Sequence, residues 1–130
     1  MIVKIWTNPL FKSGFVRYTL IMIGRDIAAH LKKLLSMYPV VTVTGPRQSG
    51  KTTLVQNLLS DWSYVSLEDP DIRSFCQSDC KGFLESYPEY TIIDEAQRVP
   101  SLFSYLQTHI DAINKNGMYI LTGSQNMNMM

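Results

Sequence analysis

The residues from Gly45 to Thr52 hold the most specific chemical signal in the chain. They read Gly45-Pro46-Arg47-Gln48-Ser49-Gly50-Lys51-Thr52 and match the pattern G-x-x-x-x-G-K-S/T, which is typical of phosphate-binding loops. In such a loop, backbone N–H groups and the positive end of a helix dipole converge on one anion. Lys51 is expected to reach the β- and γ-phosphates of a nucleotide, and the Thr52 hydroxyl to bind Mg²⁺. All of these residues, with Thr53, form the predicted nucleotide-binding set.

A pair of adjacent carboxylates forms the second candidate group. Asp94 and Glu95 follow the apolar run Thr91-Ile92-Ile93. Alone, an acidic pair after a strand is usually a helix cap or a solvated turn. Beside a phosphate loop, Asp94 is predicted to bind Mg²⁺ together with Thr52. Glu95 is predicted to be the catalytic base that orients or deprotonates the attacking water, while Lys51 and the metal offset the γ-phosphate charge.

A third polar group follows the strand predicted at Met118 to Thr122. Ser124 or Thr122 is the candidate for a hydrogen bond to the γ-phosphate or the attacking water, and Gln125 is an alternative. Small polar residues beside a glycine are also common in ordinary turns, so this interpretation stays open.

Arg47 and Arg98 flank the predicted site. Either could contact phosphate or act across a subunit interface, but a surface salt bridge is the favoured role for both.

The elements around these residues must bring them together. Val40 to Thr44, before the loop, consists of β-branched residues like a buried strand, and Thr52 to Leu59, after it, has apolar residues at helical spacing. A short glycine-rich pattern also arises by chance, but the order strand, loop and helix favours phosphate binding. Further strands are predicted at Ser63 to Leu67 and Glu89 to Ile93.

Helices are predicted between these strands. One follows Asp26, and another is capped by Asp69 with Pro70 in its first position. A third, of about fourteen residues, begins at Pro100 and ends before Gly117, which can take a left-handed conformation. The expected inner faces are Ile27, Leu31, Leu34 and Leu35; Ile72, Phe75 and Cys76; and Val99, Leu102, Phe103, Leu106, Ile110 and Ile113. Alternating strands and helices predict a parallel sheet with its functional loops at the carboxyl ends of the strands.

Bulk composition fits one globular domain. The 130 residues, 45% hydrophobic and 18% charged, are enough for a single core, and the net charge of +1 gives no overall field for nucleic acid. Cys76 and Cys80 are expected to be reduced structural thiols, consistent with a cytoplasmic location. The segment 15–24 is too short to cross a bilayer, so no membrane partner is expected. Residues 1–21 are expected to be an N-terminal extension outside the fold, and residues 22–130 the nucleotide-binding domain.

Three segments in this order, Gly45–Thr52, Ile92–Glu95 and Leu121–Ser124, resemble the nucleotide-binding domain of an AAA+ ATPase. The longer phrases 45–54, 67–73, 92–100 and 121–126 are similar to those of uncharacterised prokaryotic ATPases with an N-terminal AAA domain and a C-terminal domain of unknown function. The likeness covers about residues 24 to 126.

The resemblance implies a three-layer α/β fold of the P-loop NTPase type, mainly parallel, with strand order 1-4-3-2 counted from the phosphate-loop strand. It implies Lys51 and Thr52 as nucleotide and Mg²⁺ ligands, Asp94 as the metal-site acid and Glu95 as the catalytic base. Ser124 would then be the γ-phosphate sensor.

Members of that group continue past the position of Met130. They add a fifth strand, often a lid, and a C-terminal domain that looks nuclease-like or DNA-related. We therefore expect the fifth strand and lid to be missing and the chain to be a truncated gene product, a fragment of a longer reading frame or one piece of a split protein. The phosphate-loop strand would then be an unprotected edge of the sheet.

The leading functional hypothesis is Mg-ATP binding with ATP hydrolysis. ATP is favoured over GTP by the resemblance and by the lack of an Asn-Lys-x-Asp motif. The alternatives are a nucleotide-dependent protein- or DNA-interaction module without useful turnover, a small phosphotransferase and an inactive fragment. Besides ATP, the candidate partners are a second copy of the chain or a missing C-terminal effector domain, with DNA or a protein as further candidates.

Overall fold

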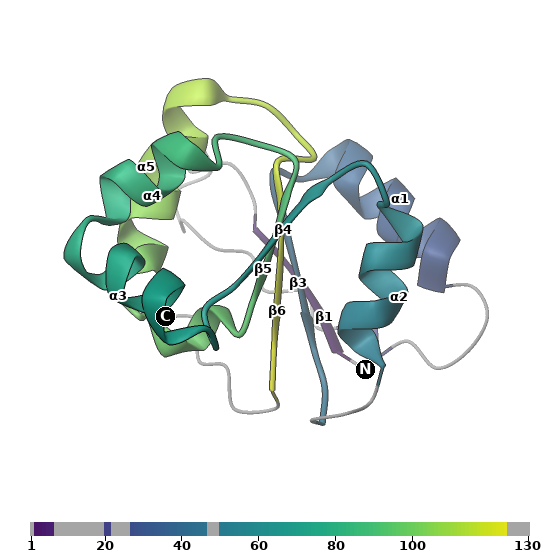
Figure 1. Cartoon of the computed structure of the whole chain (residues 1–130). Coiled ribbons are helices and arrows are strands. Elements are labelled where there is room, and N and C mark those ends of the chain that lie inside the picture. The colour runs from purple at the N-terminus through teal and green to yellow at the C-terminus, as the bar shows by residue number, and fades with distance from the viewer. Residues whose placement is uncertain (1, 7–19, 22–26, 47–49, 125–130) are drawn as a thin grey trace.

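The computed structural model describes residues 2–6, 20–21, 27–46 and 50–124. A sheet lies between two groups of helices, so the domain has three layers (Figure 1). The strands are β1 (Ile2–Trp6), β2 (Leu20–Ile21), β3 (Val40–Thr44), β4 (Ser63–Ser66), β5 (Thr91–Asp94) and β6 (Tyr119–Gly123). The helices are α1 (Ile27–Met37), α2 (Lys51–Leu58), α3 (Pro70–Ser78), α4 (Cys80–Ser86) and α5 (Leu102–Ile113), with the short 3-10 helix η1 (Ala96–Arg98).

The sheet has the strand order β2-β1-β3-β6-β5-β4. The last four strands in this order pair in parallel. Since β3 precedes the phosphate loop, the predicted order 1-4-3-2 and the α/β fold of the P-loop NTPase type are confirmed.

The outer side of β3 differs from the prediction. Strand β1 pairs with β3 antiparallel, from Ile2 opposite Thr44 to Trp6 opposite Val40, and β2 pairs antiparallel with β1. The expectation of an unprotected β3 edge was therefore wrong, and residues 1–21 do not lie wholly outside the fold. The physical reason is that the sequence of β1, IVKIW, is rich in β-branched and aromatic residues and can satisfy the open backbone groups of β3.

The two faces of the sheet have separate cores. Helices α1 and α2 cover one face, and α3, α4 and α5 cover the other (Figure 1). Side chains of successive strand residues alternate between the faces. The first core contains Leu31, Leu34, Leu35, Val41, Val43, Val55, Leu59, Ile92 and Ile120. The second includes Val40, Val65, Cys76, Phe83, Ile93, Leu102, Leu106, Ile110, Tyr119 and Leu121.

Helix ends follow local rules. The Asp69 carboxylate accepts a hydrogen bond from the backbone N–H of Asp71 at 2.9 Å, and Pro70 starts α3, as predicted. Helix α4 was not predicted; it is capped by Asp79, which accepts from Gly82 N at 2.9 Å. Helix α5 ends at Ile113, with Asn114 as its C-cap, and Gly117 takes the expected left-handed conformation with φ of 66°.

Two residues predicted to lie on inner helix faces are less buried than expected. Phe75 is 37% exposed and Ile113 is 41% exposed, since each lies at the rim of its helix's inner face.

Cys76 and Cys80 are buried free thiols, and Cys80 Sγ donates to Cys76 O at 3.0 Å. Among the described residues, no helix combines the length and apolar character that a membrane span requires.

Candidate functional site

The three predicted groups of residues meet at one edge of the sheet. Strands β3, β6 and β5 run in parallel, with Thr44 opposite Gly123 and Thr122 opposite Asp94. Gly45 N donates to Gly123 O at 3.3 Å, which joins the start of the phosphate loop to the end of β6. The shared direction of the strands therefore places all three groups at their carboxyl ends.

The phosphate loop leads directly into α2. Gly50 has φ of 81°, in the left-handed region that favours glycine, and its carbonyl accepts from Leu54 N at 2.9 Å to begin the helix. The loop residues Arg47, Gln48 and Ser49 lie outside the described residues. Gly45 is buried, while Pro46 and Thr53 are exposed. The described part of the loop thus has the turn that the sequence pattern requires.

Lys51 is a buried cation at the start of α2. Its side chain is 4% exposed, and its Nζ donates to the carbonyl of Pro46 at 3.3 Å. The ion pairs within the described residues join other cations, Arg98 with Glu68 and Lys115 with Glu89. A buried ammonium group is costly without an opposite charge, so Lys51 favours the binding of an anion beside it.

Asp94 accepts hydrogen bonds from side-chain hydroxyls on three other elements. Its Oδ1 accepts from Thr52 Oγ1 at 3.2 Å and from Thr122 Oγ1 at 2.7 Å. Its Oδ2 accepts from the Tyr64 hydroxyl at 3.0 Å and from Ser66 Oγ at 3.3 Å. Because both oxygens are held, the orientation of this buried carboxylate is well defined.

The register of the sheet explains this cluster. Ser66 lies opposite Asp94, and Asp94 lies opposite Thr122, so their side chains project from the same face. Ile92, two residues before Asp94, packs in the core beneath α1 and α2. The carboxylate therefore faces α2, which carries Thr52.

Tyr64 and Ser66 were not predicted from the sequence as partners of Asp94. The signal in the sequence is that these residues are two positions apart and therefore lie on the same face of their strand. The order 1-4-3-2 places this strand beside β5. Burial, followed by the negative charge of Asp94, raises the pKa of Tyr64 to about 12. Tyr64 therefore remains a protonated hydrogen-bond donor at neutral pH.

Glu95 occupies a different environment from its neighbour. It has φ of 54° and ψ of 44°, a left-handed conformation that turns the chain out of β5, and it is 6% exposed. The amide Nε2 of Gln97 donates both to Glu95 Oε2 and to Ser124 Oγ, the latter at 3.2 Å. One side chain thus connects the predicted base to the predicted sensor. Gln97 was not assigned a role from the sequence, although it lies only two residues after Glu95.

The oxygens of Thr52 and Asp94 fit a magnesium ion. A hydroxyl and a carboxylate are hard ligands of the kind that Mg²⁺ prefers, and Mg²⁺ usually retains waters and binds substrate phosphates besides one or two protein groups. Thr52 Oγ1 and Asp94 Oδ1 are 3.2 Å apart, close enough to bind one ion together after a small adjustment. Within the described ranges, no group of three or more His, Cys, Asp or Glu side chains is gathered for a metal.

Three further candidates were named from the sequence: Arg98, Gln125 and Arg47. Arg98 forms an exposed ion pair with Glu68, with Nη2 and Oε1 3.9 Å apart, which is the surface role favoured from the sequence. Gln125 and Arg47 lie outside the described residues.

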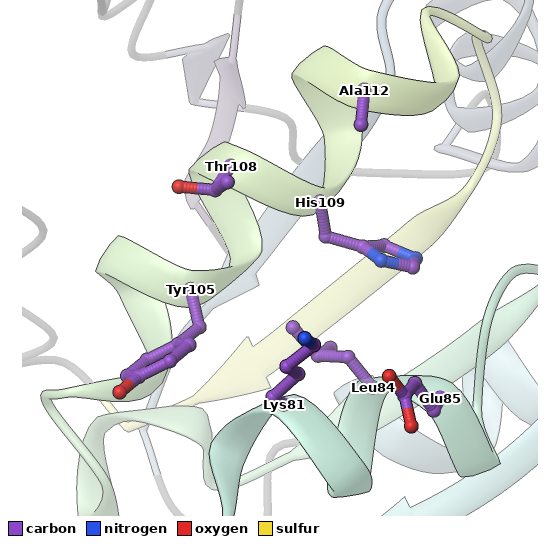
Figure 2. Close-up of a pocket in the computed structure, with 7 residues that line it drawn as sticks. All are labelled: Lys81, Leu84, Glu85, Tyr105, Thr108, His109 and Ala112. Carbon is purple, nitrogen blue, oxygen red and sulfur yellow. The ribbon is translucent and has the colours of Figure 1, made fainter.

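A hollow of about 380 Å³ lies between α4 and α5 (Figure 2). It is lined by Lys81, Leu84 and Glu85 from α4 and by Tyr105, Thr108, His109 and Ala112 from α5. A ring nitrogen of His109 lies 2.8 Å from Pro88 O. The hollow shares no residue with the Asp94 cluster, so it is not part of the predicted nucleotide site.

Comparison with known proteins identifies the family. A family model described as an AAA domain matches residues 37–130. The chain belongs to this AAA domain family. The match confirms the resemblance noted from the sequence and indicates a nucleotide-binding, ATPase-like domain.

Curated relatives include an uncharacterized protein of Mycobacterium bovis and one of Mycobacterium tuberculosis. Each is 34% identical to this AAA domain over 101 residues, which cover 77% of the chain and 23% of the relative. The match thus spans about a quarter of the length of these proteins. No solved structure matches the chain.

Proposed function

We propose that this AAA domain binds Mg-ATP and hydrolyses it to ADP and phosphate. The observation that carries the proposal is the contact between Thr52 of the phosphate loop and Asp94, residues 42 positions apart in the sequence. The contact brings the predicted metal ligands together beside the buried Lys51 cation and directly before Glu95. An isolated glycine-rich turn or an isolated acidic pair would not require this arrangement.

Each group would contribute a separate part of the reaction. The loop N–H groups and Lys51 would bind the β- and γ-phosphates, and Thr52 and Asp94 would hold Mg²⁺. When bound, the ion supplies positive charge that neutralises the phosphate oxygens. Glu95 would accept a proton from water as the water oxygen bonds to the γ-phosphorus and the bond to the bridging oxygen of ADP breaks. Ser124 would donate a hydrogen bond to a γ-phosphate oxygen.

A nucleotide-dependent interaction module is the second candidate. The observation that favours it is the 23% coverage of the relatives, because in those proteins the matching domain is one part of a longer chain. Binding of ATP would then change the contacts of the domain with an effector domain, a second copy, a protein or DNA. Turnover would be secondary in that case.

The decisive measurement is calorimetric titration of the chain with Mg-ATP, using Lys51→Ala as the matched variant. We expect binding by the original protein and a loss of at least about tenfold in affinity for the variant, since a hydrogen bond between charged groups is worth about 1.5–3 kcal/mol. Equal affinities would overturn the site. ATP turnover that is the same with and without Glu95→Gln would favour the interaction module over hydrolysis.

A further inference from the structure

We propose that Gln97 is a positioning residue, whose amide orients the Glu95 carboxylate for catalysis and couples it to Ser124. The proposal rests on the proposed ATP hydrolysis and adds to it a residue that acts through Glu95. Gln97 belongs to η1, the short helix that follows β5.

The local backbone brings the amide back over Glu95. Glu95 leaves the strand in a left-handed conformation, and Arg98 N donates to Glu95 O at 3.1 Å to close the turn. Within this turn, Gln97 Nε2 donates to Glu95 Oε2. Since a non-glycine residue in the left-handed region is uncommon and costs backbone free energy, this turn has a defined shape that aims both side chains.

The same nitrogen also reaches a different strand. Gln97 Nε2 donates to Ser124 Oγ at 3.2 Å, across 27 positions of sequence. A primary amide carries two N–H donors, so it can serve both acceptors at once. The amide therefore connects the end of β6, where the phosphate sensor is predicted, to the predicted base at the end of β5.

The chemistry of these groups suits coupling. A carboxylate that is to accept a proton needs donors that hold it without neutralising its charge, and a neutral amide does this. The Ser124 hydroxyl can accept from Gln97 and still donate its own hydrogen to a γ-phosphate oxygen. A hydrogen-bonded chain would then run from the phosphate through Ser124 and Gln97 to Glu95, so the base is oriented when the γ-phosphate is present.

A second glutamine offers a matched control. Gln107 on α5 also donates from Nε2 to a carboxylate, Asp111 at 3.0 Å, and like Gln97 it has a buried Oε1 without a hydrogen-bond partner among the described residues. Gln107, however, contacts none of the predicted catalytic groups. If the substitution of Gln97 lowers turnover and the substitution of Gln107 does not, the loss comes from the position of Gln97 beside Glu95. It does not come from the loss of a glutamine–carboxylate hydrogen bond in general.

The experiment measures phosphate release and Mg-ATP affinity for the full chain and for Gln97→Leu, Gln97→Glu and Gln107→Leu. Gln97→Leu is expected to lower kcat by about 10- to 100-fold, as supporting residues of catalytic groups do, with Kd for ATP changed less than about twofold. Gln107→Leu should leave kcat unchanged. In Gln97→Glu, a second carboxylate beside Glu95 disfavours its ionised form, so the acid limb of the kcat–pH profile should move to higher pH.

The outcomes separate this proposal from the proposed function. If Glu95→Gln abolishes turnover while Gln97→Leu keeps the original kcat and Gln97→Glu keeps the original pH profile, the role of Gln97 is overturned and hydrolysis stands. If Glu95→Gln has no effect on turnover, the proposed hydrolysis itself fails. Should Gln97→Leu not fold, as the absence of a cooperative thermal transition would reveal, the pH profile of Gln97→Glu decides alone, and an unshifted profile overturns the role.

Discussion

Asp94 and Glu95 are adjacent in the sequence, yet the two regions that hold them are built differently. Asp94 is the last residue of β5 and receives hydrogen bonds from hydroxyls on β4, α2 and β6. Glu95 lies in the turn that follows and is held by one amide from the same turn. The sheet register thus determines the position of Asp94, whereas a local turn determines that of Glu95. The first kind of support suits the metal ligand that we propose for Asp94, and the second is compatible with the base that we propose for Glu95.

The largest expected effect concerns Glu95. Glu95→Gln should lower ATP turnover by about 100- to 10,000-fold, because a general base contributes that much to the rate. Its free energy of unfolding should change by less than about 1 kcal/mol, since the side-chain carbonyl of glutamine can still accept the hydrogen bond from Gln97. Phosphate release and urea denaturation measure the two quantities. A large loss of stability would show that Glu95 is as firmly built into the fold as Asp94.

Asp94→Asn, in contrast to Glu95→Gln, should lower the stability of the fold. The side-chain amide nitrogen of the variant would replace one carboxylate oxygen and would meet hydroxyls that donate to that oxygen in the original protein. We therefore expect a loss of about 1–3 kcal/mol in the free energy of unfolding, measured by urea denaturation. The dependence of ATP affinity on Mg²⁺ should also weaken, as calorimetry with and without the ion would show. A stability equal to that of Glu95→Gln would remove the distinction between the two carboxylates.

Tyr64→Phe tests one hydroxyl of the Asp94 region. We expect a loss of about 0.5–1.5 kcal/mol in the free energy of unfolding, the usual net value of a hydrogen bond. Tyr105→Phe, at a tyrosine that is 50% exposed, is the control and should have almost no effect.

The raised pKa of Tyr64 adds a dependence on pH. Its pKa is about 12 in the folded protein against an ordinary tyrosine value of 10.0, so the folded state retains the proton to higher pH. The stability that Tyr64 contributes is complete below pH 10 and is lost as the pH rises toward about 12. Denaturation of Tyr64→Phe should therefore show a shallower decline over this window than the original protein. An unchanged decline would mean that other groups account for it.

The smallest effect is expected at Arg98. Arg98→Ala removes the exposed ion pair with Glu68, which should be worth less than about 1 kcal/mol and should shrink further in salt. Turnover in the isolated chain should remain unchanged. A large drop in phosphate release would instead assign Arg98 to the site and enlarge the region around Glu95.

Local patterns predicted the elements of the fold well. The β-branched run Val40 to Thr44 is a strand with the predicted bounds, and Asp69 caps its helix as expected. The patterns were less informative for residues at the edges of apolar helix faces and for the start of the chain. Phe75 is more exposed than its helical spacing suggested, and Ile2–Trp6 joins the sheet. Periodicity shows which side of an element is apolar but not how far a neighbouring element covers it.

The sequence by itself determined the chemistry that is available: a phosphate loop with Lys51 and Thr52, a strand that ends in two carboxylates, and a small polar residue after the next strand. The resemblance carried by these motifs also indicated the strand order. Only the tertiary structure decided that Tyr64, Ser66 and Thr122 share one carboxylate, that Gln97 bridges two loops and that β1 covers β3. The partners of Asp94 lie 28 to 42 positions away in the chain. Their meeting depends on strand order and register, which arise when whole elements pack and which no short pattern of residues contains.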